Sequence, residues 1–119
     1  MWTYEQHNGE LTHNGEFVGN GYSGMGSGRN NGMAQHIPNI GPIPCGQYKI
    51  AAKRDEIPGL GPCVMNLDPT PGTQTFGRSL FRIHGDNKNH DASHGCIILG
   101  PLIRAAIANS GDHDLVVIT

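Results

Sequence analysis

The sequence predicts a mainly β fold that carries one short helix. Eighteen glycines and eight prolines among 119 residues indicate many turns and little helix. Short segments that mix apolar and polar residues recur between turn residues, which is typical of short strands. Helical spacing of apolar residues is found in one place, directly after Pro101. We therefore expect strands joined by tight turns, with a single helix late in the chain.

Length and charge restrict the class of protein. A chain of 119 residues predicts one domain over residues 1–119, with a modest core. The net charge of −2 and the scattered basic residues give no electrostatic footprint for nucleic acid. No apolar run reaches the roughly 18 residues that a membrane span needs. The first residues have neither the basic start nor the apolar stretch of a secretory signal, so we expect synthesis in the cytoplasm without a signal peptide.

The first half of the chain predicts four strands. Asn8-Gly9 and Asn14-Gly15 are dipeptides that two-residue hairpin turns prefer, because both turn positions require a positive φ. The glycines and asparagines over residues 24–32 indicate an irregular loop. The predicted strands cover residues 2–6, 10–13, 16–22 and 47–53, the last with Tyr48 and Ile50 on one face.

The second half predicts three strands and the helix. Residues 54–62 are polar and rich in proline and glycine, so we expect a loop there. Pro101 suits the first turn of a helix. The predicted apolar stripe of this helix is Leu102, Ala105, Ala106 and Asn109, widened by Ile103 and Ile107. The predicted strands cover residues 63–67, 79–84 and 115–118.

Residues 81–99 are the best candidate for a catalytic site. If Phe81 and Ile83 enter the core, His84 lies on the open face at the end of its strand. The polar loop that follows ends at Cys96. A thiol needs a base to become a useful nucleophile near neutral pH, and imidazole is the usual partner. The stretch therefore predicts a cysteine nucleophile assisted by a histidine.

The order of residues in this stretch resembles the catalytic motif of the L,D-transpeptidase family, a histidine followed after a spacer by Ser/Thr-His-Gly-Cys. Enzymes of this family attack the tetrapeptide stems of peptidoglycan with a cysteine. The matching residues are His84, Ser93, His94, Gly95 and Cys96. Residues 2–4, 11–15, 21–26 and 41–48 are similar to a small branch of the family, antibacterial effectors delivered by type VI secretion. The resemblance covers nearly the whole chain and implies a small β-sandwich domain.

The resemblance also implies a role for each motif residue. Cys96 would be the nucleophile, and His84 the general base that takes its proton. The backbone carbonyl near Gly85 would orient the His84 ring, and His94 would shape and polarise the pocket. Ser93 and Gly95 complete the site, with the backbone N–H groups around Gly95 and Cys96 stabilising the oxyanion. No cofactor and no metal is implied.

The chemistry that the resemblance implies is acyl transfer in two steps. The cysteine expels the terminal D-alanine of the stem, and the thioester then passes to water or to an amine such as a free D-amino acid. Such an enzyme would act in the periplasm of a target bacterium, with an immunity protein and a secretion component as partners. Candidates for binding the carboxylate of the stem are Arg29, Arg78 and Arg82, and Tyr22 is a candidate for lining the groove.

Other interpretations of the same residues stay open from the sequence. One is a zinc site with His84, His90, His94 and Cys96 as ligands, although their spacing matches no common pattern of paired ligands. Another is a non-enzymatic β binding module that uses the glycine-rich loop. The remaining cysteines, Cys45 and Cys63, are either paired in a disulfide or reduced and partly buried.

Overall fold

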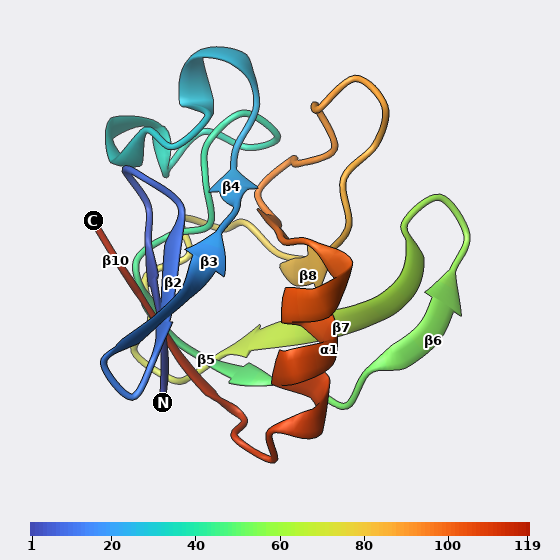
Figure 1. The fold of residues 1–119 in the computed structure, drawn as a ribbon. Helices are drawn as coiled ribbons and strands as arrows, with labels where there is room; N and C mark the ends of the chain where they lie inside the picture. The colour runs from blue at the N-terminus through green and yellow to red at the C-terminus, as the bar shows by residue number, and fades with distance from the viewer.

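The computed structural model describes residues 1–119 and confirms a mainly β fold with one short helix after Cys96. Neighbouring strands are hydrogen-bonded in the order β3-β2-β1-β10-β5-β7-β8-β9-β4, and β6 pairs with β7 beside this path. The sheet is nearly closed and barrel-like, with the helix α1 beside β7 (Figure 1). No helix is long and apolar enough to cross a membrane.

The bounds of the elements follow. The strands are β1 (Trp2–Glu5), β2 (Glu10–His13), β3 (Glu16–Asn20), β4 (Tyr22–Ser23), β5 (Gly46–Ile50), β6 (Arg54–Ile57), β7 (Gly61–Pro69), β8 (Arg82–His84), β9 (Ile97–Ile98) and β10 (Asp114–Ile118). The helix is α1 (Pro101–Asn109). Two short 3-10 turns, Gly26–Gly28 and Gly32–Ala34, lie in the stretch expected to be irregular.

The core lies inside the curved sheet and is built from alternate residues of its strands. Tyr48 and Ile50 of β5 are both buried, as predicted, because residues two apart in a strand share a face. β1 runs parallel to β10 and antiparallel to β2, so segments from opposite ends of the chain pair in the middle of the sheet. The two hairpin dipeptides behave differently. Asn14 and Gly15 have φ of 50° and 87° and form the predicted two-residue turn between β2 and β3. The connection between β1 and β2 spans residues 6–9, with a positive φ only at Gly9.

The loop predicted over residues 54–62 is wrong for its first part, because Arg54–Ile57 forms β6. This strand is antiparallel to β7, with Arg54 opposite Val64 and Glu56 opposite Pro62. The hairpin stands away from the rest of the sheet (Figure 1). Its residues Arg54 to Glu56 are exposed, so they lack the apolar alternation by which a strand is recognised in a sequence.

The predicted apolar stripe of the helix is wrong for Leu102, Ala105, Ala106 and Asn109, which face outward, whereas Ile103 and Ile107, which were expected to widen it, do pack inward. Leu102 is 86% exposed, and Ala105 and Ala106 are exposed as well. The inward residues are Ile103, Arg104, Ile107 and Ala108, of which Arg104 and Ile107 are fully buried. At about 100° per residue the two sets lie on opposite faces. Both sets fit helical spacing, so spacing alone did not select the side that packs against the sheet. Pro101 begins the helix, as expected.

All three cysteines are unpaired in the structure. Of the two alternatives for Cys45 and Cys63, the structure therefore has the free thiols.

Candidate active site

The candidate site is built on two short parallel strands. Ile83 of β8 lies opposite Ile97 of β9, and His84 lies opposite Ile98. Ile83 and Ile97 enter the core together with Phe81, so the neighbouring residues face the other side. His84 therefore lies on the open face, as the alternation predicts, where it lines a hollow of about 860 Å³.

Cys96 lies close to His84 in the strand pairing. It directly precedes β9, and its Sγ lies 3.7 Å from the carbonyl oxygen of Leu80. If the register of the two strands is continued by one residue, Cys96 lies opposite Arg82 and diagonal to His84. The long-range pairing of β8 with β9 thus brings together two residues that are separated in the sequence by the whole loop.

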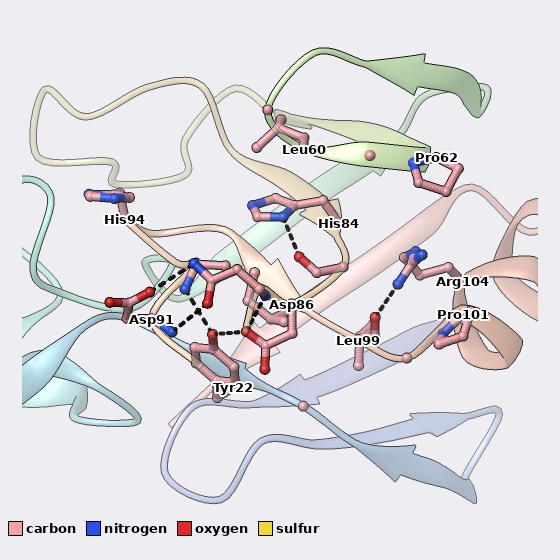
Figure 2. Close-up of a pocket in the computed structure, with 18 of the residues that line it drawn as sticks. Tyr22, Leu60, Pro62, His84, Asp86, Asp91, His94, Leu99, Pro101 and Arg104 are labelled. Carbon is pink, nitrogen blue, oxygen red and sulfur yellow. Dashed lines mark hydrogen bonds between the residues drawn. The ribbon is translucent and has the colours of Figure 1, made fainter. Parts of the chain in front are cut away.

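The ring of His84 is held in one orientation. Its Nδ1 lies 2.9 Å from the carbonyl oxygen of Gly85, the contact expected from the sequence (Figure 2). A carbonyl only accepts, so Nδ1 carries the hydrogen and Nε2 carries the lone pair. Burial lowers the pKa of His84, which the nearby charges of Arg104 and Arg82 lower further, against the raising effects of the Gly85 hydrogen bond and Asp86. The imidazole is therefore neutral at pH 7, as a base must be.

Cys96 is a protonated thiol at neutral pH. Burial raises its pKa, and the backbone N–H of Arg82 and the charges of Arg82 and Arg78 offset part of that effect. Its Sγ lies 3.7 Å from the carbonyl oxygen of Leu80, and no hydrogen bond joins it to His84. In unliganded enzymes such contacts are often long and tighten only with substrate. A raised thiol pKa means that Cys96 depends on a base for activation.

Ser93 fixes the turn that carries the cysteine. Its buried hydroxyl donates to the carbonyl of Cys96 at 2.6 Å and accepts from the N–H groups of Gly24 and Gly95. Of the N–H groups expected to stabilise an oxyanion, that of Gly95 is engaged by the Ser93 hydroxyl. The N–H of Cys96 makes no hydrogen bond within the protein. The turn thus offers one free backbone donor at the cysteine itself.

Arg78 lies beneath this turn rather than in a position to bind a stem peptide. Its guanidinium donates to the backbone carbonyls of Gln35, Gly41, Pro42 and His94. A Cβ on Gly95 would lie 2.3 Å from Arg78 Nη2, and Gly95 has φ of +124°, so only glycine fits there. Arg78 therefore joins the turn to the proline-rich segment before β5, with its donors used by backbone carbonyls.

The loop between His84 and Ser93 is fastened through Tyr22 of β4. The Tyr22 hydroxyl donates to Asp86 at 2.6 Å and accepts from the N–H of Ala92 at 3.0 Å (Figure 2). Burial and the bond to Asp86 raise the pKa of Tyr22 to about 12, so it stays protonated. Arg29 stacks on its ring at 3.8 Å and donates to the carbonyl of His90. Tyr22 lines the hollow, as expected, and also holds the loop.

The predicted residues divide between two hollows. His84, Gly85, His94 and Tyr22 line the larger one. Arg78 and Arg82 line a second hollow of about 230 Å³. Arg82 donates through Nε to Asn66, which leaves the other end of its guanidinium free. Cys96 is not among the residues that line either hollow, and its sulfur contacts the carbonyl of Leu80, a residue that lines the smaller one.

Sequence reasoning missed Arg104, which lines the larger hollow from α1. The signal was an arginine inside an otherwise apolar helical stretch, Leu102 to Ala108. The zinc interpretation can also be compared with the geometry. No group of three or more His, Cys, Asp and Glu side chains is arranged to hold a metal ion.

Comparison with known families gives one match. Residues 18–116 match the family described as the Tlde1 domain. A search of curated proteins finds none that matches this chain. The matched range contains both hollows and every residue of the site described above.

Proposed function

The chain belongs to the Tlde1 domain family, a family of type VI secretion effectors, and we propose that it is a peptidoglycan L,D-carboxypeptidase and L,D-transpeptidase with Cys96 as its nucleophile. One observation carries the proposal. His84 has its Nδ1 hydrogen held by the Gly85 carbonyl and a free lone pair on Nε2, and the register of β8 and β9, continued by one residue, would put Cys96 diagonal to it. This is the arrangement that a cysteine with a raised pKa needs from its base.

The first half of the reaction would form a thioester. His84 Nε2 takes the proton of Cys96 while the sulfur attacks the carbonyl carbon between the third residue of the stem and the terminal D-alanine. The resulting oxyanion accepts from the N–H of Cys96, the donor that the protein leaves free. The carbon–nitrogen bond then breaks, and the imidazolium returns its proton to the amine of the leaving D-alanine.

The second half regenerates the thiol. Water or the amine of a free D-amino acid attacks the thioester, and His84 takes a proton from it. The carbon–sulfur bond breaks, and Cys96 recovers its proton from His84. Water yields a shortened stem, and an amine yields an exchanged one. Either product deprives a target cell of donors for cross-linking.

The remaining parts of the proposal follow from the family. The enzyme would act in the periplasm of a target bacterium, and the producer would hold a cognate immunity protein there. His94, on the rim of the larger hollow, would contact the stem peptide, and Arg82 would do so from the smaller one. The chemistry needs no cofactor.

The test uses purified protein and disaccharide-tetrapeptide stems from Gram-negative peptidoglycan, with and without D-methionine. Mass spectrometry reads the products. We expect loss or exchange of D-alanine by the wild type, none by Cys96→Ala or His84→Ala, and wild-type activity for Cys45→Ala, a matched change at another half-buried cysteine. A chelator should leave activity intact. Intact stems in every reaction of the folded protein would overturn the proposal. Loss of activity in chelator would favour zinc, and toxicity that survives Cys96→Ala would favour a binding module.

A further inference from the structure

Arg104 is a buried cation without a partner for most of its guanidinium. The residue is 6% exposed, and Nη1 donates to the carbonyl of Leu99 at 2.6 Å. Nε is buried and makes no hydrogen bond, and Nη2 makes none either. No carboxylate lies within ion-pair distance of it. Buried charges are normally paired, because removing them from water is costly. Of the two free nitrogens, Nε is enclosed by the protein, and Nη2 is the one that can donate a charge-assisted hydrogen bond to a carboxylate.

The guanidinium lies against the proposed base. A Cβ on Gly85 would be 2.7 Å from Arg104 Nη1 and 3.2 Å from Nη2, so the charge packs directly on the residue that orients His84. Figure 2 shows that Arg104 and His84 line the same hollow. The arginine thus lies next to Gly85, the residue that orients the proposed base, and it has no role in the steps proposed above.

The start of α1 adds to the positive character of this place. Gly100 is the N-cap residue and supplies no side chain to the free N–H groups of the first turn. Gly100 and Pro101 line the same hollow as Arg104. A helix N-terminus favours negative charge. The acidic residues of the hollow have other partners, because Asp86 binds Tyr22 and His90 and Asp91 binds Asn87.

We propose that Arg104, together with the N-terminus of α1, forms a carboxylate-binding subsite for the stem peptide beside His84. The inference rests on the proposed function, in which the stem carries a carboxylate on its terminal D-alanine and another on the side chain of its diamino acid. Arg104 donates to one of them through Nη2 and thereby places the scissile bond between His84 and Cys96. It replaces the substrate arginines expected from the sequence as the principal contact with that charge.

The experiment measures binding without turnover. Cys96→Ala protein is titrated by calorimetry with three peptides: the tetrapeptide, the same peptide with a C-terminal carboxamide, and the same peptide with lysine as its diamino acid. Each titration is repeated in Cys96→Ala/Arg104→Met and, as a control, in Cys96→Ala/Arg54→Met, which changes an exposed arginine of β6. We expect Arg104→Met to weaken binding of the tetrapeptide about 10- to 100-fold, as for a lost charge-assisted pair. Arg54→Met should leave it unchanged.

The modified peptides identify the carboxylate. If Arg104 binds the terminal carboxylate, the carboxamide binds weakly and equally to both proteins, whereas the lysine peptide still shows the difference. If it binds the carboxylate of the diamino acid, the lysine peptide binds weakly and equally to both proteins, whereas the carboxamide still shows the difference. Equal weakening of all three peptides by Arg104→Met, or no weakening, overturns the inference.

Two further measurements separate the subsite from folding and from the proposed function. Arg104→Lys keeps the charge but not the Nη2 donor, and we expect an intermediate loss for the carboxylate peptide alone. If Arg104→Met does not fold, this variant decides, since equal weakening of every peptide by Arg104→Lys would overturn the subsite. Turnover by the Cys96 protein is measured with the same peptides. If carboxylate binding depends on Arg104 but no turnover is seen, the subsite is supported and the proposed chemistry is overturned. If turnover is seen but carboxylate binding does not depend on Arg104, the chemistry is supported and the subsite is overturned.

Discussion

Arg78 and Arg104 are two buried arginines on either side of the candidate site, with exposed fractions of 9% and 6%, and they differ in how their donors are used. Arg78 donates to four backbone carbonyls that come from three separate parts of the chain. Arg104 donates to one and leaves an edge of its guanidinium free. Burial alone therefore does not distinguish an arginine that holds a fold from one that is available to a ligand. The number of guanidinium donors that have a partner within the protein distinguishes the two.

Replacing each arginine by methionine should show this difference most strongly. Arg78→Met leaves buried carbonyls without donors, so we expect the free energy of unfolding to fall by about 3 kcal/mol or more. Arg104→Met removes one hydrogen bond but also an unpaired buried charge, so we expect a loss of about 1 kcal/mol or less. Urea titrations followed by the fluorescence of Trp2, the single and buried tryptophan, measure both. Equal losses in the two variants would contradict the comparison.

The glycines that touch the two guanidinium groups give a second, smaller contrast. Gly95→Ala places a Cβ 2.3 Å from Arg78 Nη2 at φ of +124°, and Arg78 is held by its carbonyls and cannot move away. We expect a loss of about 2 kcal/mol in the free energy of unfolding. Gly85→Ala meets an arginine with a single hydrogen bond, which can shift, so the loss should be about 1 kcal/mol. Its main effect should be weaker binding of stem carboxylates.

Ser93→Ala changes the turn that Arg78 supports. Its loss in the free energy of unfolding should lie between those expected for Arg78→Met and for Gly85→Ala. Removing the hydroxyl leaves the N–H groups of Gly24 and Gly95 and the carbonyl of Cys96 without their partner. We expect a loss of about 2 kcal/mol in the free energy of unfolding and a lower kcat, because the free N–H of Cys96 loses its fixed direction. Ser27→Ala, at an exposed serine whose side chain makes no hydrogen bond, is the control. A stable variant with wild-type kcat would show that the turn does not need this clamp.

Much of the fold, and the face on which His84 lies, could be predicted from the sequence, because both depend on the local pattern of residues. Alternation in residues 81–83 places His84 on the open face, and Asn14-Gly15 makes a two-residue turn. The strand β6 was missed because its side chains are exposed, and the helix face was misjudged because two stripes have the same spacing.

The partners of the buried polar groups could not be predicted, because they are backbone groups far away in the chain. Arg78 contacts carbonyls 36 and 37 residues before it in the sequence, and no pattern of side chains encodes that contact. The parallel pairing of β8 with β9 is of the same kind. The hydrogen bond from the Gly95 N–H to the Ser93 hydroxyl, which occupies that donor, could likewise not be predicted without the structure of the turn.

The smallest expected effect concerns the protonation of His84, and it again separates the two arginines. Burial lowers the pKa of His84 below its ordinary value of 6.5, and the charge of Arg104 lowers it further, as does that of Arg82. The base is therefore neutral at pH 6.5 and is protonated only at lower pH, so the acid limb of kcat/KM should have its midpoint below 6.5. Arg104→Met removes a positive charge next to Gly85 and should raise the pKa of His84, which moves the acid limb toward neutral pH.

The charge of Arg78 is not among those that shift the pKa of His84, so a conservative Arg78→Lys variant should leave that pKa in place. An NMR titration of the His84 ring, with Arg54→Met as a control, measures this independently of turnover. A pKa of His84 that is the same with and without Arg104 would mean that the guanidinium is too far from the base to place a carboxylate beside it.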